Sequence, residues 1–547
     1  MLTIQSPRQP LAAAFGLTLA VMLAACGGTA APASSAAAPA ASAAASRPAA
    51  AASTAAASAG AATASAAKPT AGGTLTVGFA GDMESGDPFL NSSIHGKSIA
   101  LHMFDNLIEV APDGKLVPGL AESWKVADPK TISFTLRKGV KFHNGEDFNA
   151  DAAKFSIDRM KDPATKSGVA SKYASIENVQ VVDANTIQLN LSKPDATLFF
   201  AFAAQLGMEP PAYVKQVGAE GFAAKPVGTG PYKFVEWVRG DHVTLEANPN
   251  YWSGSPKGKP AVQRVTFRPI PEESARVAAL KSGQVQFIDH VSGDIAATLA
   301  SNDIAIVSKE TTQLPQVHID TRSGPTKELK VRQALNYAVD VESIMKDILK
   351  VQGKRLNTSM SPSTIGYDPS LPSYTYDPNK AKQLLAEGGF GSGFQTKIDY
   401  PTVETKQVVE AIQAYLGAVG VKAEVNPMEI GAYNTNWRAA KDKMAPLAFV
   451  TYGAEVDPGN MGLFLTCQGL LSRYCNQQVD ELWQKQLATY DEAERATQMR
   501  QIGKLLHDDA GFIFMYPGVE NYAMSKKVSG FQPSADGRIR LFSVGIG

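Results

Sequence analysis

The sequence is short of cysteine, with only three among 547 residues. So few thiols exclude a disulfide-dense scaffold and leave too few ligands for a structural cage of metal-bound cysteines. The sequence also lacks an excess of one charge, because Lys plus Arg and Asp plus Glu both total 52. A chain without a basic field has no electrostatic attraction for nucleic acid, so we expect no nucleic-acid partner.

Long apolar runs are missing after residue 26, and no segment there could span a bilayer. The first 26 residues instead have the layout of an export signal, with Arg8 as a thin positive region and an apolar run at 11–23. Residues 23–27, LAACG, match a bacterial lipobox, in which Cys26 offers the thiol for lipid attachment. We therefore predict a lipid on Cys26, which would hold a folded body at a membrane surface. The alternative is a plain secretory signal whose cleavage site happens to precede a cysteine.

Residues 27–71 consist mostly of Ala, Ser, Pro and Thr. Such a composition offers almost nothing to bury, so we expect a disordered tether between the anchor and the folded body. The rest of the chain, 72–547, is too long for one hydrophobic core and predicts more than one globular unit.

Motifs of catalysis are absent. The seven histidines form no H-E-x-x-H, and no G-x-S-x-G serine elbow occurs. The run Gly96-Lys97-Ser98 is similar to the end of a P-loop, but Asn91 stands where the upstream glycine belongs. These absences favour a protein that is not an enzyme, although a site assembled in space leaves no motif. We expect no cofactor and assign no metal.

Hydrophobic periodicity predicts one long amphipathic helix over residues 331–349, where apolar residues recur at i, i+3, i+4 and i+7. Alternating or β-rich runs predict strands at 73–80, 131–137 and 264–269, among others. Helices and strands alternate between 377 and 426, which is typical of an α/β lobe.

Several phrases of the sequence resemble one known family. They are RQALNYAVD at 332–340, LAESW at 120–124, RKGVKFHNGEDF at 137–148, GTGPY at 228–232 and NPNYW at 248–252. Together they resemble the family 5 extracellular solute-binding proteins, the peptide- and nickel-binding group that feeds ABC importers. The resemblance implies a two-lobed α/β fold like that of periplasmic binding proteins (type II, large, cluster C-like), with mixed sheets and a cleft between the lobes.

On this reading the first lobe is built from both ends of the folded chain, residues 72–314 and 511–547. The second lobe, residues 315–510, is inserted between two crossover segments. Two lobes joined by crossing strands form a hinge, and a hinge with a cleft can trap a ligand.

Residues 449–458, FVTYGAEVDP, resemble the family's cleft segment, typically Trp-x-x-Asp-Tyr-x-Asp-Pro. In peptide binders of the family the aromatic residue borders the ligand, and the first acid pairs with its α-ammonium group. Tyr452 stands at the aromatic position and Glu455 at or next to the acid, but the segment is one residue shorter. A glutamate can still bind an ammonium group through a charge-assisted hydrogen bond. A solvated surface glutamate is the alternative.

Other candidates for ligand contact have equally plain structural alternatives, such as packing in a core or covering a loop. The full set of predicted ligand-binding residues is Met83, Glu84, Trp437, Tyr452, Gly453, Glu455, Arg473 and Tyr516. His318, close to the first crossover, is expected to be a structural histidine.

The remaining cysteines, Cys467 and Cys475, form an even pair in a chain with an export signal. We predict a disulfide between them. Two free buried thiols are the alternative.

The function that follows is capture of a small solute, most simply a short peptide or another ammonium-bearing molecule, and its delivery to the permease of an ABC transporter. A nickel chelate or another non-peptide solute is the alternative within the family, and an exported hydrolase or an adaptor for a sensor is the alternative outside it. We expect a monomer, held by its lipid in the cell envelope, either on the outer face of the cytoplasmic membrane or in the periplasm.

Overall fold

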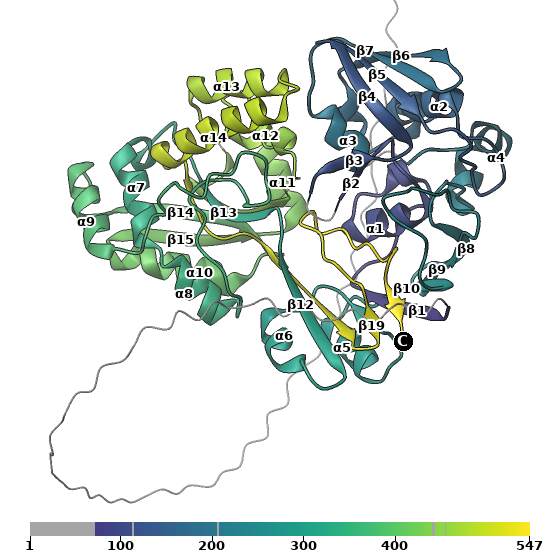
Figure 1. Cartoon of the computed structure of the whole chain (residues 1–547). Coiled ribbons are helices and arrows are strands. Elements are labelled where there is room, and N and C mark those ends of the chain that lie inside the picture. The colour runs from purple at the N-terminus through teal and green to yellow at the C-terminus, as the bar shows by residue number, and fades with distance from the viewer. Residues whose placement is uncertain (1–71, 112–113, 205–206, 440–442, 454–455) are drawn as a thin grey trace, which may run out of the picture. The chain divides into compact units, whose positions relative to one another are not determined.

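The computed structural model describes residues 72–547, except 112–113, 205–206, 440–442 and 454–455 (Figure 1). Four predicted features lie outside the described residues: the signal segment, the lipidation site at Cys26, the tether, and the ligand contact of Glu455. In the part of the chain that is described, no helix combines the length and the hydropathy needed to cross a membrane.

A seven-stranded mixed sheet forms the centre of the first lobe. Its strand β1 is parallel to both neighbours, β10 and β11, so the carboxyl ends of these three strands meet at one edge. In order across the sheet the strands are β12 (Ile304–Glu310), β18 (Val519–Ser525), β11 (Phe287–Ile288), β1 (Thr74–Phe79), β10 (Arg264–Pro269), β9 (His242–Ala247) and β8 (Tyr232–Val238).

The first lobe also carries a separate four-stranded antiparallel sheet. Ile132, Phe134 and Leu136 alternate along one of its strands, and all three are fully buried. Their period of two places them on the face that packs against the amphipathic helix α2 (Ala150–Lys161). In order across the sheet the strands are β4 (Ala121–Asp128), β5 (Thr131–Leu136), β7 (Thr186–Leu191) and β6 (Ile176–Asp183).

A five-stranded mixed sheet forms the centre of the second lobe. Helices α8 (Val341–Ser343) and α10 (Lys406–Ala418) lie on one side of it, and α13 (Gln477–Leu487) and α14 (Glu492–Asp509) lie on the other (Figure 1). Two apolar cores follow from this arrangement, one under each group of helices. In order across the sheet the strands are β15 (Val421–Met428), β14 (Phe394–Pro401), β16 (Leu447–Gly453), β13 (Gln313–Ile319) and β17 (Phe512–Ile513).

The prediction of one continuous helix over 331–349 is wrong. Helix α7 (Leu329–Ala338) ends where Val339 takes an extended conformation (φ −102°, ψ 121°). Asp340 then caps the short helix α8 by accepting a hydrogen bond from the backbone nitrogen of Ser343 at 2.9 Å. A π-helical turn, Ile344–Ile348, follows. The apolar stripe itself is buried as expected, but a capping aspartate within it starts a new helix.

The chain passes between the lobes twice, from β12 to β13 and from β17 to β18. The strand pairing differs from the predicted boundaries 314/315 and 510/511. Strand β13 already begins at Gln313, and β17 still pairs with β13 in the second lobe. The chain rejoins the first lobe only at Val519, because the apolar residues of β17 and the next turn fill the second lobe's core.

Candidate functional site

The two crossover segments are hydrogen-bonded to each other. The backbone nitrogen of Thr311 donates to the carbonyl of Gly518 at 2.7 Å, and the nitrogen of Gly518 donates to the carbonyl of Gln313 at 2.8 Å. A Cβ on Gly518 would lie only 2.8 Å from the Cβ of Gln313, so the close approach of the two segments requires glycine there. The crossovers thus form a paired hinge.

A cavity of about 640 Å³ opens beside this hinge, and we call it the crossover cavity. Residues 291–294 of the first lobe line it, as do 347–351 and 404–405 of the second lobe and 516–519 of the second crossover. Its volume is in the range of pockets that bind small ligands. A solute held here would contact both lobes.

Glu404 provides a half-buried carboxylate in the wall of the cavity. It follows β14 in the turn that leads into α10. One carboxylate oxygen accepts from the backbone nitrogen of Thr451 at 2.6 Å, and the other accepts from the Thr451 hydroxyl at 2.9 Å. Burial raises the pKa of Glu404, and the two hydrogen bonds from Thr451 only partly offset this. The carboxylate is therefore fixed in position, but its hydrogen bonds do not fully offset the cost of burying its negative charge.

Among the predicted site residues that the structure describes, only Tyr516 lines the crossover cavity. Its ring is 7% exposed. Burial, with the negative charge of Glu404 as the second cause, raises the pKa of the Tyr516 hydroxyl, which therefore stays neutral. A neutral phenol beside a carboxylate can orient a polar solute by donating or accepting a hydrogen bond.

Tyr452 and Trp437 lie on the opposite face of the second lobe's sheet. Thr451 lines the cavity, and successive side chains of a strand alternate between faces, so Tyr452 points away from it. The Tyr452 hydroxyl is 3.0 Å from the hydroxyl of Ser359. The indole nitrogen of Trp437 donates to the carbonyl of Leu471 at 2.7 Å. Both rings pack in apolar clusters rather than in the crossover cavity.

Arg473 is likewise buried away from the crossover cavity. One of its guanidinium nitrogens, Nη2, donates to Asp320 at 3.2 Å and to the carbonyl of Met444 at 3.4 Å. Its Nε and Nη1 have no hydrogen-bond partner among the described residues. Burial lowers the pKa of Arg473, and the carboxylate of Asp320 opposes that effect.

Met83 and Glu84 follow β1 at the carboxyl edge of the first lobe's sheet. Met83 is 2% exposed and packs in the apolar core of that lobe. Glu84 accepts hydrogen bonds from the backbone nitrogen of Ser93 at 2.7 Å and from the hydroxyl of Ser92 at 3.1 Å. It therefore holds the start of helix α1 (Ile94–Met103).

Gly453 ends β16 and pairs with Gln313, which lines the cavity. Glu455 lies outside the described residues, so its role stays a prediction. Sequence reasoning missed Glu404. The sequence did contain a signal for it, because ligands of α/β sheets gather where parallel strands end, and Glu404 lies in the turn just beyond the parallel strand β14.

Residues 115–469 match the family model described as "Bacterial extracellular solute-binding proteins, family 5 Middle". The chain belongs to this family. Family 5 solute-binding proteins serve transport: they capture a small solute outside the cytoplasm and deliver it to an ABC importer.

Two curated relatives support the assignment along most of the chain. A glutathione-binding protein, GsiB, of Pectobacterium atrosepticum is 31% identical over 470 residues, which are 82% of this chain and 90% of the relative. Heme-binding protein A of Haemophilus influenzae is 30% identical over 468 residues, which are 78% of this chain and 84% of the relative.

The fold is confirmed by a solved structure, that of HbpA2 from Haemophilus parasuis. It superposes with a TM-score of 0.78 at 26% identity and covers 87% of this chain and all of its own. The predicted two-lobed α/β architecture of this solute-binding protein is therefore correct.

Proposed function

We propose that this solute-binding protein takes up a short peptide, or another small solute with an ammonium group, in the crossover cavity. We further propose that a lipid on Cys26 anchors it at the membrane. The observation that carries the ligand proposal is the half-buried carboxylate of Glu404 in a cavity lined by both lobes.

Charge in the cavity favours a cationic group on the solute. Three carboxylates line it, those of Glu404, Asp294 and Asp347, against one ammonium, that of Lys350. An ammonium group would form a charge-assisted hydrogen bond with Glu404, about twice as strong as a neutral one. Tyr516 would lie alongside the solute and exclude water from that bond.

The relative GsiB supports a peptide-like ligand, because its name states that it binds glutathione. Glutathione is a tripeptide with a free ammonium group and carboxylates. Lys350 could pair with a carboxylate of such a molecule, so the cavity offers partners for both kinds of charge.

Binding and delivery follow from the hinge. A solute that contacts residues 291–294 of the first lobe together with Glu404 of the second gains its full set of contacts only when the lobes are together. Binding therefore shifts the population towards the closed form, in proportion to the difference in affinity between the two states. The permease can then recognise the closed form without any chemical step by this chain.

Calorimetric titration with short peptides tests the ligand proposal. We expect free tripeptides to bind and N-acetylated ones to bind at least tenfold more weakly. Glu404→Gln should lower the affinity for the free peptide about tenfold or more, because a charged hydrogen bond is lost.

Two further variants sharpen this test. Glu424→Gln removes the same charge at an exposed site, where Glu424 pairs with Lys397, and should leave affinity unchanged. Glu455→Gln distinguishes between the two candidate carboxylates. If affinity fell in Glu455→Gln but not in Glu404→Gln, the ammonium group would bind in the predicted cleft segment instead. Equal affinity of all variants and of acetylated peptide would contradict the proposal.

The anchor has a separate test. Cys26→Ser should move the exported protein from the membrane fraction to the soluble fraction, and mass spectrometry should find acyl chains on the N-terminal cysteine of the wild type only. Unchanged fractionation would favour the plain secretory signal.

A further inference from the structure

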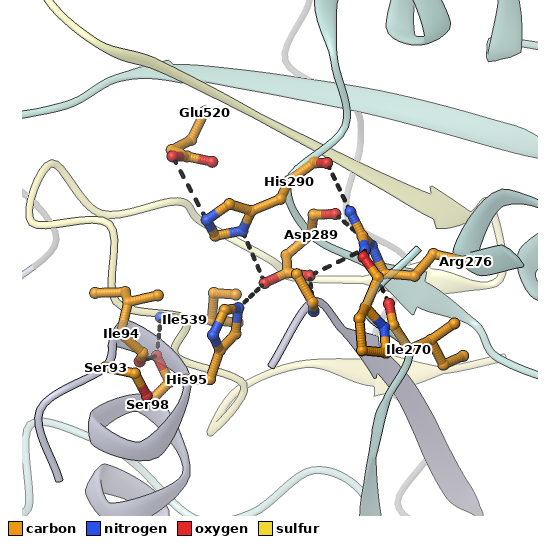
Figure 2. Close-up of polar contacts among 12 residues, drawn as sticks. Ser93, Ile94, His95, Ser98, Ile270, Arg276, Asp289, His290, Glu520 and Ile539 are labelled. Atoms are coloured by element: carbon orange, nitrogen blue, oxygen red, sulfur yellow. Dashed lines mark hydrogen bonds and ion pairs between the residues drawn. The ribbon is translucent and has the colours of Figure 1, made fainter. Parts of the chain in front are cut away.

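A cluster of potential metal ligands lies in the first lobe, apart from the crossover cavity. His95, Asp289 and His290 each offer a ligand atom, and these atoms all lie within 4.8 Å of one another (Figure 2). Asp289 and His290 directly follow β11, at the edge where three parallel strands end. Side chains that follow such strands commonly form binding sites.

One carboxylate oxygen is shared by both rings. Asp289 Oδ2 lies 2.8 Å from His95 Nε2 and 2.9 Å from His290 Nδ1. The other oxygen, Oδ1, accepts from the backbone nitrogen of Ala80 at 2.9 Å. The carboxylate is thus held from one side, and its second oxygen is aimed between two imidazoles.

The chain holds this arrangement at a conformational cost. His290 has φ of 48°, in the left-handed region that a residue with a Cβ rarely adopts. Arg276 fixes the turn through the backbone, since Nε donates to the carbonyl of Asp289 at 3.3 Å and Nη2 to that of His290 at 3.0 Å. Residues in such strained conformations persist only where the surrounding contacts hold them in place, and they cluster at functional sites.

Arg276 forms no hydrogen bond with the Asp289 carboxylate in the described structure. Its Nη1 donates to the carbonyls of Ile270 and Pro271, and its Nε lies 3.9 Å from Oδ1 of the Asp289 carboxylate. Asp289 Oδ2 is therefore contacted by the two imidazoles, whereas Arg276 approaches the other oxygen.

We propose that His95 Nε2, His290 Nδ1 and Asp289 Oδ2 bind one divalent first-row transition-metal ion of the zinc type. Two imidazoles and one carboxylate are ligands that such ions accept, with the fourth position left to water. Ligand atoms of a tetrahedral zinc ion with bonds of about 2.0 Å lie roughly 3.3 Å apart. The two Asp289–histidine contacts need to open by about half an ångström to admit the ion. As the ion enters, each ligating ring nitrogen gives up its proton, either to the other nitrogen of the same ring or, from a doubly protonated ring, to solvent.

Glu520 completes the arrangement from β18. Its carboxylate oxygen lies 3.9 Å from His290 Nε2, the ring nitrogen that faces away from Asp289 (Figure 2). A histidine that ligates a metal commonly points its other ring nitrogen at a carboxylate, which orients the ring. Glu520 is thus a positioning residue for the site.

The site is accessible, because the side chain of His290 is 39% exposed while that of Asp289 is fully buried. None of the three ligands lines the crossover cavity. Two neighbouring residues line the cavity instead: Val291, which follows His290, and Asn521, which follows Glu520. These two residues are hydrogen-bonded to each other. An ion would therefore stiffen one rim of the cavity without entering it.

Titration of the chelator-treated chain with zinc chloride tests the proposal. We expect one ion per chain with micromolar or tighter affinity, and a higher Tm in its presence. His95→Gln and His290→Gln should each lower the affinity at least a hundredfold, and Glu520→Gln about tenfold. His242→Gln is the matched control, because His242 lies 2.8 Å from Asp241 and 3.3 Å from Glu236 at another histidine–carboxylate cluster, and it should bind zinc as the wild type does.

A measurement on the unaltered chain removes any dependence on how the variants fold. With nitrogen-15-labelled histidine, zinc should shift the ring signals of two of the seven histidines, those absent from the His95 and His290 variants. No binding at micromolar zinc, unshifted rings, or loss of binding in His242→Gln would overturn the proposal. A purely structural role for the cluster would lower the Tm of the variants without any zinc dependence in the wild type.

Discussion

The hydroxyl of Tyr490 accepts a hydrogen bond from the backbone nitrogen of Asp195 at 3.1 Å. It also donates to the carbonyl of Pro129 at 2.9 Å, and its ring packs against Phe199. Tyr490 lies between α13 and α14 of the second lobe. Its partners belong to the first lobe: Pro129 to the turn between β4 and β5, Asp195 to the loop after β7, and Phe199 to helix α3 (Leu198–Ala204). One side chain thus joins the two lobes at a point away from the hinge.

Removing this hydroxyl should favour separation of the lobes. Tyr490→Phe loses two hydrogen bonds but keeps the ring, and we expect solute affinity to fall about fivefold, equivalent to roughly 1 kcal/mol. Small-angle scattering of the unliganded variant should show a larger radius of gyration. Tyr213→Phe is the control, because the Tyr213 hydroxyl bonds Lys225 within one lobe. Affinity unchanged in Tyr490→Phe, or equally reduced in Tyr213→Phe, would contradict this role.

The pH dependence of binding should report on Glu404. Burial raises its pKa above the ordinary value of 4.5, so its charge is lost at a higher pH than that of an exposed glutamate. Affinity for an ammonium-bearing solute should therefore fall as pH falls through the raised pKa. The folded chain holds this proton more tightly than the unfolded chain, so the same group adds stability as pH falls.

Binding and stability thus move in opposite directions over that window, which separates loss of the charge from acid unfolding. Calorimetry and thermal melts at matched pH values measure the two trends. In Glu404→Gln both contributions of this group should disappear. A pH profile of affinity identical to that of the wild type would show that another group binds the ammonium.

The sequence predicted the fold better than the site, and the reason is physical. Strands such as β5 were predicted because a period of two reports burial on one face. The break in the helix at Val339 was missed, because one aspartate can either face solvent or cap a helix, and only the backbone decides.

The site was harder to predict because it depends on which face a side chain takes. Tyr452 and Thr451 are neighbours in sequence, yet only Thr451 lines the cavity. Asp457, within the segment that resembles the family's cleft, pairs with Arg495. Distant residues also meet only in the fold, as His95 does with Asp289. Periodicity carries no information about such contacts.

The disulfide between Cys467 and Cys475 should stabilise the second lobe. It closes a short loop, since the two cysteines are 8 positions apart. For a loop of this length the chain-entropy model gives a stabilisation of about 2–3 kcal/mol. The double variant Cys467→Ser/Cys475→Ser should lower the free energy of unfolding by that amount in denaturant titrations. A reducing agent should destabilise the wild type and leave the double variant unchanged; sensitivity of both would point to another cause.

The ion pair between Asp457 and Arg495 should matter for stability rather than for ligand binding. Both side chains are buried, and each carboxylate oxygen of Asp457 accepts from a guanidinium nitrogen of Arg495. Asp457→Asn would leave the buried guanidinium without its counter-charge, and we expect a loss of about 3–5 kcal/mol in the free energy of unfolding. Asp158→Asn breaks an exposed pair with Lys154 and should cost less than about 1 kcal/mol. If Asp457→Asn instead kept its stability but lost solute affinity, the aspartate would belong to the binding site, and the cleft segment would deserve the role that its resemblance implied.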